Sequence, residues 1–428
     1  MAHTDSKMPP AIHLLVLTVF IDLIGFGIII PLLPLYAETF HAGAFTIGLL
    51  MACFSFWQFV FAPILGAWSD RIGRRPVLLI SLLGTILGYI PLAVADRFPQ
   101  HVAALGGIPL GLLLLFLSRT VDGISGGNIS TAQAYIADIT TPEDRVKGMG
   151  MIGAAFGMGF IFGPVIGSVL VRYGFHWPAL AAMFLAAVNW IWAWRSLPES
   201  LKPGCAPAER KSPLLAIARS LGNPRVATLI LIVFVATFAF ANLEATLTLY
   251  LKDRLGLTAA AAAPRTGVYF AYIGFLMALI QGGAIRRLRG KHLERALVVG
   301  GTLCFAIGLF GMALVTNTTV LLIPLAFVAF GSGFVNPSLT SLISQHAEPG
   351  EMGETIGASQ GMSGLARILG PLAAGILYGK ASGALFPLDP GRPYLVAGIV
   401  MTLAFLLALG IKRSRIPALA ETPTGTTL

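Results

Sequence analysis

Long apolar stretches set the pattern of this chain. Runs of about twenty apolar residues recur from position 12 to position 411, and short polar segments separate them. A run of this length crosses a bilayer as a helix, whereas a membrane β-barrel would show alternating segments of about ten residues. The pattern predicts twelve membrane-spanning helices, over residues 12–36, 45–68, 76–95, 108–138, 148–171, 178–197, 226–251, 267–285, 296–315, 320–345, 353–378 and 394–411.

Composition supports an all-α polytopic membrane protein. Hydrophobic residues make up 56% of the chain and charged residues only 11%, with a mean hydropathy of +0.81. When both termini are placed on one side, most lysines and arginines fall in the loops of that side, as expected for the cytoplasmic face. The net charge of +10 therefore reflects topology, and we predict no nucleic-acid partner. The three cysteines are too few and too scattered for a disulfide framework or a metal site.

An internal repeat divides the chain. The segment NISTAQAYIAD from Asn128 matches NPSLTSLISQH from Asn336, and each leads into a glycine-rich span that contains Gly-Pro. Between them, residues 198–225 are rich in proline and charge, with a short amphipathic stretch. We predict a six-helix bundle over 1–197, a cytoplasmic linker over 198–225, and a second six-helix bundle over 226–428 that ends in a short cytoplasmic tail.

One charged loop separates the second and third predicted spans. A short basic loop follows from topology alone, but topology does not explain a carboxylate flanked by glycines in GAWSDRIGRR. This spacing resembles motif A of the major facilitator superfamily, a gating loop on the cytoplasmic side. The residues that carry the resemblance are Gly66, Asp70, Arg71, Gly73, Arg74 and Arg75.

Apart from Asp138 at the inner end of the fourth predicted span, three carboxylates lie deep inside predicted spans, where each costs about 2.5 to 3.5 kcal/mol and should face the bundle interior. Asp122 lies three residues from Arg119, on the same helical face. Asp22 and Glu244 have no cation in their own helices. These four residues are our candidates for proton coupling; alternatively, Arg119 and Asp122 only lock their helix.

Aromatic and amide side chains in the same spans offer a large apolar contact area with few fixed polar groups, which suits amphipathic substrates. Our candidates for substrate binding are Phe26, Gln58, Asn128, Tyr135, Tyr269, Tyr272, Gln281 and Asn336.

The fifth predicted span carries a glycine pattern with two interpretations. Small residues at this spacing allow close helix packing, and the proline could simply kink the helix. The pattern also resembles motif C, the antiporter signature of superfamily exporters. It consists of Gly159, Gly163, Pro164 and Gly167.

Together with FIDLIGFGIIIPLLP and RTVDGISGGNISTAQAYIADIT, these motifs resemble the drug:proton antiporters, most closely the tetracycline/H⁺ antiporter subgroup. The resemblance implies that Asp22 and Gln58 lie at a central cavity and that Arg119 is the motif B arginine. It departs from the subgroup at Gly88, where tetracycline exporters carry an aspartate. A broader amphipathic substrate is therefore expected in place of a magnesium-tetracycline chelate.

We thus expect a proton-coupled antiporter that exports amphipathic or cationic small molecules, in multidrug or tetracycline-like efflux. The alternatives are a symporter or facilitator of sugars or metabolites and, from another class, a non-transporting receptor or scaffold. The sequence contains no GxxxxGK[ST] motif, so we do not expect an ATP-driven pump. We expect no enzymatic activity and no cofactor, with the proton gradient as energy source, in a monomer of the bacterial inner membrane with both termini cytoplasmic.

Overall fold

The computed structural model describes residues 9–98, 107–201, 213–284, 293–346, 352–378 and 389–411. Among the sequence predictions, the middle of the linker at 202–212 and the tail at 412–428 lie outside these ranges.

Twelve helical segments of the described chain are long and apolar enough to cross a membrane, which confirms the predicted all-α polytopic class. The helices are α1 (Pro10–Ile29), α3 (Ala44–Ile72), α4 (Arg74–Val94), α5 (Leu110–Ser125), α6 (Asn128–Ile139), α7 (Pro142–Leu170), α8 (His176–Ser196), α10 (Pro224–Asp253), α11 (Ala259–Leu279), α13 (Glu294–Leu314), α14 (Leu322–His346), α15 (Met352–Tyr378) and α16 (Arg392–Leu409). Helices α5 and α6 form one span. Two shorter helices are α2 (Leu33–Glu38) and α9 (Pro213–Leu221).

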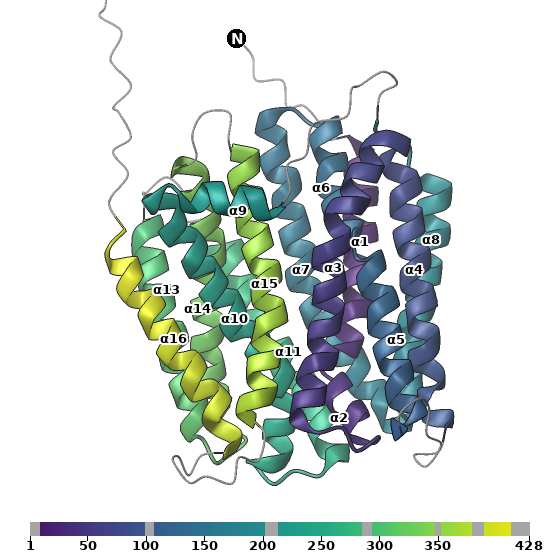
Figure 1. Cartoon of the computed structure of the whole chain (residues 1–428), viewed down its shortest axis with the longest axis vertical. Helices are drawn as coiled ribbons and strands as arrows, with labels where there is room; N and C mark the ends of the chain where they lie inside the picture. Colours follow the sequence, from purple (N-terminus) through teal and green to yellow (C-terminus); the bar gives the residue numbers. More distant parts are fainter. Residues whose placement is uncertain are drawn as a thin grey trace, which may run out of the picture.

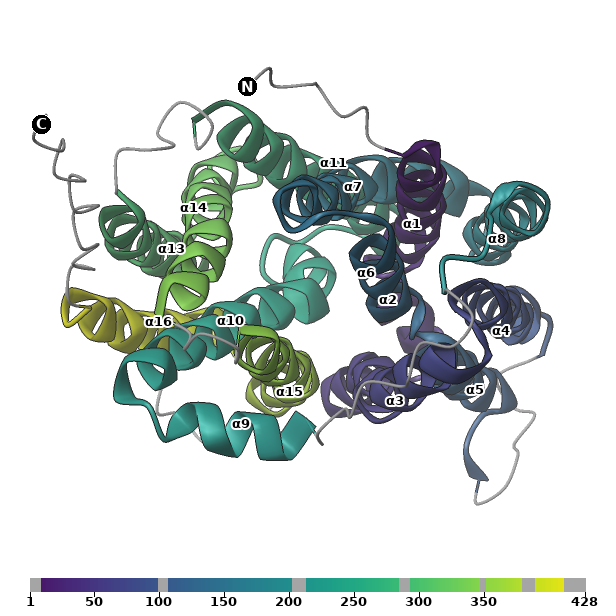
Figure 2. The same ribbon diagram turned by 90° about the horizontal axis from the view of Figure 1, so that it is seen from above.

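The spans form two six-helix bundles, as the sequence predicted. Helices α1 to α8 lie on one side and α10 to α16 on the other (Figures 1 and 2). Each bundle has its own apolar core. Helix α3 packs against α15 and α7 against α11, so two helix pairs join the bundles. We call these the N-terminal and C-terminal bundles.

Two of the predicted spans are interrupted. The first was predicted as one helix over 12–36, but α1 ends at Ile29 and α2 begins at Leu33. Pro31 lies between them and has no N–H to continue the helical ladder. The fourth was predicted as one helix over 108–138, but Gly126 and Gly127 separate α5 from α6. The sequence predicted that Pro31 and Pro34 would bend the first span, but not that its helix would end there, and it did not predict the break at the glycine pair.

The two bundles also contact each other through polar side chains at one end of the molecule. We call the end that holds Gly73 and the start of α1 the motif end (upper in Figure 1). At the opposite end, Lys252 of α10 forms an ion pair with Glu38 of α2. The Thr248 hydroxyl donates to the carbonyl of Pro31 at 2.7 Å. The α1 to α2 interruption therefore provides a contact for the other bundle.

Candidate functional site

A small pocket lined by several polar side chains lies between helices of the two bundles. It has a volume of about 40 Å³, which holds one or two water molecules but is far below the 300 Å³ or more typical of a drug-sized site. Its lining consists of Asp22, Leu23, Phe26, Phe54, Gln58, Thr85, Tyr89, Asp122, Gly126, Asn128, Ile129, Phe156 and Arg367. Five residues that the sequence analysis selected from four different helices therefore meet here.

Asp22 is held by the interrupted fourth span. One carboxylate oxygen accepts a hydrogen bond from the Asn128 side chain, at the first residue of α6. The positive end of the α6 dipole favours a negative charge at this position. The other oxygen, Oδ1, is buried and has no hydrogen-bond partner among the described residues. Asp22 therefore retains an unused acceptor inside the membrane.

The glycine pair that interrupts the span also orients Gln58. Because the helix breaks after Ser125, the carbonyl of Gly126 is available to a side chain, and the Gln58 amide donates to it at 3.2 Å. Phe26 packs nearby on Phe54, with ring centroids 5.2 Å apart. These glycines therefore shape the pocket in addition to allowing helix packing.

Asp122 has two partners within the N-terminal bundle, Arg119 and Thr85. Its Oδ2 lies 3.2 Å from the Arg119 guanidinium, and the Thr85 hydroxyl is within hydrogen-bonding reach. Arg119 is only 1% exposed and lies over the Phe54 ring at 5.7 Å from its centroid. A Cβ on Gly88 would lie 3.1 Å from the Cβ of Asp122. The acid of α5 therefore packs directly against Gly88 of α4.

Sequence reasoning did not single out Arg367, which lies in the middle of α15. Every other residue that lines the pocket belongs to the N-terminal bundle. Arg367 is also the charged group that acts on Glu244, which lies on the facing α10 of the C-terminal bundle. The signal was present in the sequence, because an arginine in the apolar stretch GLARILGPL is as costly as an intramembrane acid.

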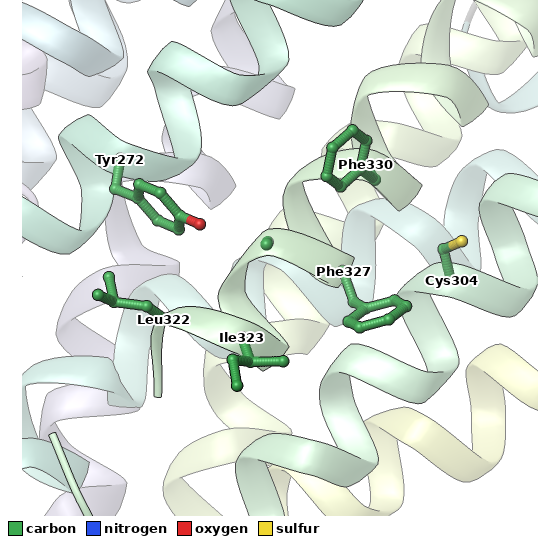
Figure 3. A pocket seen from close by; sticks show the side chains of 7 residues that line it. Tyr272, Cys304, Leu322, Ile323, Phe327 and Phe330 are labelled. Carbon is green, nitrogen blue, oxygen red and sulfur yellow. The ribbon is translucent and has the colours of Figure 1, made fainter. Parts of the chain in front are cut away.

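Tyr272 lies in a separate apolar groove of about 330 Å³ between α11, α13 and α14 (Figure 3). The groove shares no residue with the central pocket. Three of its members, Ile323, Phe327 and Phe330, are exposed on a membrane-spanning helix. We therefore assign this groove to the lipid-facing surface, and Tyr272 is not brought to the central pocket.

The remaining binding candidates also lie outside the central pocket. The buried Tyr135 hydroxyl donates to the carbonyl of Pro198 at 2.7 Å. The Tyr269 hydroxyl donates to the carbonyl of Thr318 at 2.9 Å. Gln281 lies in a π-helical turn after α11, and Asn336 is an exposed residue of α14. Aromatic and amide character did not reveal which face of each helix these residues occupy.

The motif A loop is a dense network within the N-terminal bundle. Arg74 forms an ion pair with Asp70, one helical turn away across Gly73. Its Nε donates to Asp138 at the end of α6 at 2.8 Å, and a terminal nitrogen donates to Ser69 at 2.7 Å. Asp70 and Arg74 are both buried. The loop thus links α3, α4 and α6 through charges.

Glu199, which the sequence analysis placed in the linker, completes this network. Its carboxylate accepts from the backbone N–H groups of Arg74 at 2.9 Å and Arg75 at 3.1 Å, and so caps the N-terminus of α4. Gly73 has φ of +112°, which disfavours any side chain, and a Cβ there would meet the Glu199 carboxylate. The start of the linker is therefore hydrogen-bonded to the motif A loop through Glu199.

Motif C forms the contact between α7 and α1. A Cβ on Gly163 would lie 2.7 Å from backbone atoms of Gly27, and a Cβ on Gly159 would lie 2.8 Å from the Cβ of Leu23. The next residue, Pro164, also contacts Gly267 of α11 in the other bundle. The glycines therefore allow a close helix contact directly beside Asp22.

A comparison with known families agrees with this architecture. The sequence model described as "Major Facilitator Superfamily" matches residues 15–371. The chain belongs to the major facilitator superfamily. Its solved superfamily relatives include the human organic anion transporter MFSD10 (TETRAN), at 26% identity and a TM-score of 0.70, with 94% of this chain and 100% of that chain covered.

Two curated relatives in the superfamily have drug-resistance names. The class C tetracycline resistance protein of Escherichia coli is 30% identical over 370 residues, which cover 85% of this chain and 89% of that protein. Multidrug resistance protein 2 of Bacillus subtilis (strain 168) is 27% identical over 413 residues, with 95% and 96% covered. The resemblance to tetracycline exporters is thereby confirmed, and the chain is a multi-pass membrane protein of a transporter family.

Proposed function

We propose that this protein is a proton-coupled antiporter that exports amphipathic or cationic small molecules across the bacterial inner membrane. The observation that carries the proposal is the Asp22 carboxylate, whose Oδ1 is buried without a hydrogen-bond partner among the described residues, in a pocket lined by residues of both bundles. An intramembrane carboxylate can be neutralised either by a proton or by a cationic substrate. Because only one of them can bind at a time, the proton and the substrate compete for the site.

The size of the pocket supports separate positions for the proton and the substrate. About 40 Å³ accommodates water and protons but not an amphipathic drug. We therefore propose that Asp22, Asp122 and Asn128 form the proton-exchange part of the site, and that Phe26 and Gln58 border the substrate. The substrate volume arises when the bundles rock apart.

The orientation follows from the charged loops. We propose that the motif end is cytoplasmic, because Arg71, Arg74 and Arg75 lie there together with the linker. The ion pair between Lys252 and Glu38 then closes the periplasmic end. Rocking of the two bundles around the central pocket would open the two ends alternately.

The test is transport by the purified protein in proteoliposomes with an imposed proton gradient. Uphill movement of ethidium, accompanied by proton movement in the opposite direction, is expected. Magnesium-tetracycline, an organic carboxylate and a pentose serve as comparison substrates. Uptake of the pentose together with protons would replace antiport by symport, and equal movement of ethidium without the gradient would rule out proton coupling.

A further inference from the structure

An arginine of the C-terminal bundle lines a pocket that otherwise belongs to the N-terminal bundle. Arg367 is exposed to the space between the bundles, although it lies in the middle of the span Thr355–Tyr378. No ion pair within 4.0 Å joins its guanidinium to any residue that the structure describes. A charge in the membrane core is retained only where it has a role or a partner.

Acids of both bundles surround this guanidinium. Asp22 and Asp122 line the same pocket from the N-terminal bundle, while Glu244 lies on α10 of the C-terminal bundle and is influenced by the charge of Arg367. Asp122 is already paired with Arg119. Asp22, which has an unpartnered oxygen, and Glu244 are therefore the two acids left as partners for Arg367.

The net charge of this cluster is balanced by one monovalent cation. Asp22, Asp122 and Glu244 carry three negative charges when ionised, and Arg119 and Arg367 carry two positive charges. One proton, or the ammonium group of one organic cation, brings the total to zero. Arginine remains protonated at all physiological pH values, so Arg367 can be displaced from an acid but cannot be neutralised there.

We propose that Arg367 is an internal counter-ion that alternates between Asp22 and Glu244 and that competes with protons and organic cations for Asp22. This inference rests on the proposed proton antiport. In the empty, deprotonated carrier, Arg367 pairs with Asp22 across the bundle interface and locks the two bundles together. A proton or a cation on Asp22 releases Arg367 to Glu244, and the bundles can then rock.

The lock accounts for obligatory exchange, because a carrier that reorients empty would dissipate the gradient. It also sets specificity, because a substrate must bring a positive group that can replace the guanidinium at Asp22. Arg367 is thus a positioning and specificity-determining residue of the same site.

Two measurements on Arg367→Gln test the proposal. Removal of the competitor should tighten equilibrium ethidium binding in detergent by about fivefold or more. The same variant should lose uphill, proton-driven ethidium transport while downhill ethidium flux continues without a gradient. Arg367→Lys, which retains a charge, should remain closer to the parent in both measurements. Arg225→Gln removes an exposed arginine at the start of α10 and is the matched control.

Pairing with Asp22 is tested by the double variant Asp22→Asn with Arg367→Gln. If the two residues interact, their effects on binding will be non-additive. Should Arg367→Gln fail to fold, Arg367→Met keeps the apolar length of the side chain and takes its place.

Several outcomes would overturn the proposal. They are unchanged ethidium affinity with intact coupling in Arg367→Gln, strictly additive effects in the double variant, or a lysine variant as uncoupled as the glutamine variant. Loss of binding of an organic carboxylate in Arg367→Gln, with ethidium binding unaltered, would instead make Arg367 a ligand for substrate anions. A parent protein that moves no cation against its gradient would refute the proposed antiport itself, independently of the Arg367 variants.

Discussion

The two bundles share a fold but differ in how they use polar residues. The N-terminal bundle contains the motif A network, the paired Asp122 and Arg119, and nearly all of the central pocket. The C-terminal bundle is built around one large apolar core, and its described residues contribute Arg367 alone to the pocket lining. This difference suggests that one bundle binds the coupling ion while the other supplies a counter charge and the closing surface.

The largest expected effect is the loss of proton-driven transport in Asp22→Asn, compared with Glu244→Gln. Asp22→Asn removes the acid with the unpartnered oxygen and should lower proton-driven transport on the order of 100-fold, within the usual range of coupling energies. Glu244→Gln should cost several-fold less, because Glu244 only receives Arg367 after its release. Initial rates in proteoliposomes measure both. Equal losses in the two variants would contradict the different roles that we propose for the two bundles.

The next effect concerns the α1 to α7 contact of the N-terminal bundle. Gly163→Ala places a methyl group 2.7 Å from the Gly27 backbone and should destabilise the protein by roughly 1 to 3 kcal/mol. Gly300→Ala in the C-terminal bundle is the control, because no atom lies within 4 Å of the added carbon. Thermal unfolding in detergent compares the two. A Gly163→Ala protein as stable as the control would contradict the close contact.

A third prediction concerns the motif end. We propose that Asp70, beyond its pair with Arg74, contacts the N-terminal end of α15 when the cytoplasmic side closes. Asp70→Asn should reduce transport by about tenfold, which corresponds to about 1.4 kcal/mol, while expression stays near normal. Arg225→Gln, a charge removal at the same end of the other bundle, should change little. Full transport by Asp70→Asn would exclude a gating role.

The smallest effect is expected at the end of the molecule opposite the motif end. The ion pair between Glu38 and Lys252 joins the bundles, but both side chains are about one quarter exposed, so the pair contributes roughly 0.2 to 1 kcal/mol to closure. Lys252→Gln should therefore shift the balance of open and closed states by less than about fivefold. The reversed pair, Glu38→Lys with Lys252→Glu, should restore it. Accessibility of an introduced cysteine to a membrane-impermeant maleimide reports the shift.

The site could be predicted only in part. Asp22, Asp122 and Gln58 line the central pocket, as expected because a polar group in an apolar span is costly and must face the interior. Tyr135, Tyr269 and Tyr272 lie outside this pocket, because an aromatic side chain is equally stable in a core, at a lipid surface or in a cavity. Glu199 was assigned to the linker because its role as a cap for α4 depends on a contact between distant segments.

The sequence by itself determined the twelve spans, the two bundles and the charged loop, because the length of an apolar run and the cost of a membrane charge are local properties. Only the tertiary structure decided that the fourth span breaks at Gly126 beside Asp22, and that Arg367 from the other bundle reaches the same pocket. Helical periodicity places a residue on a face of its own helix. Which face of another helix it meets depends on packing across residues hundreds of positions apart.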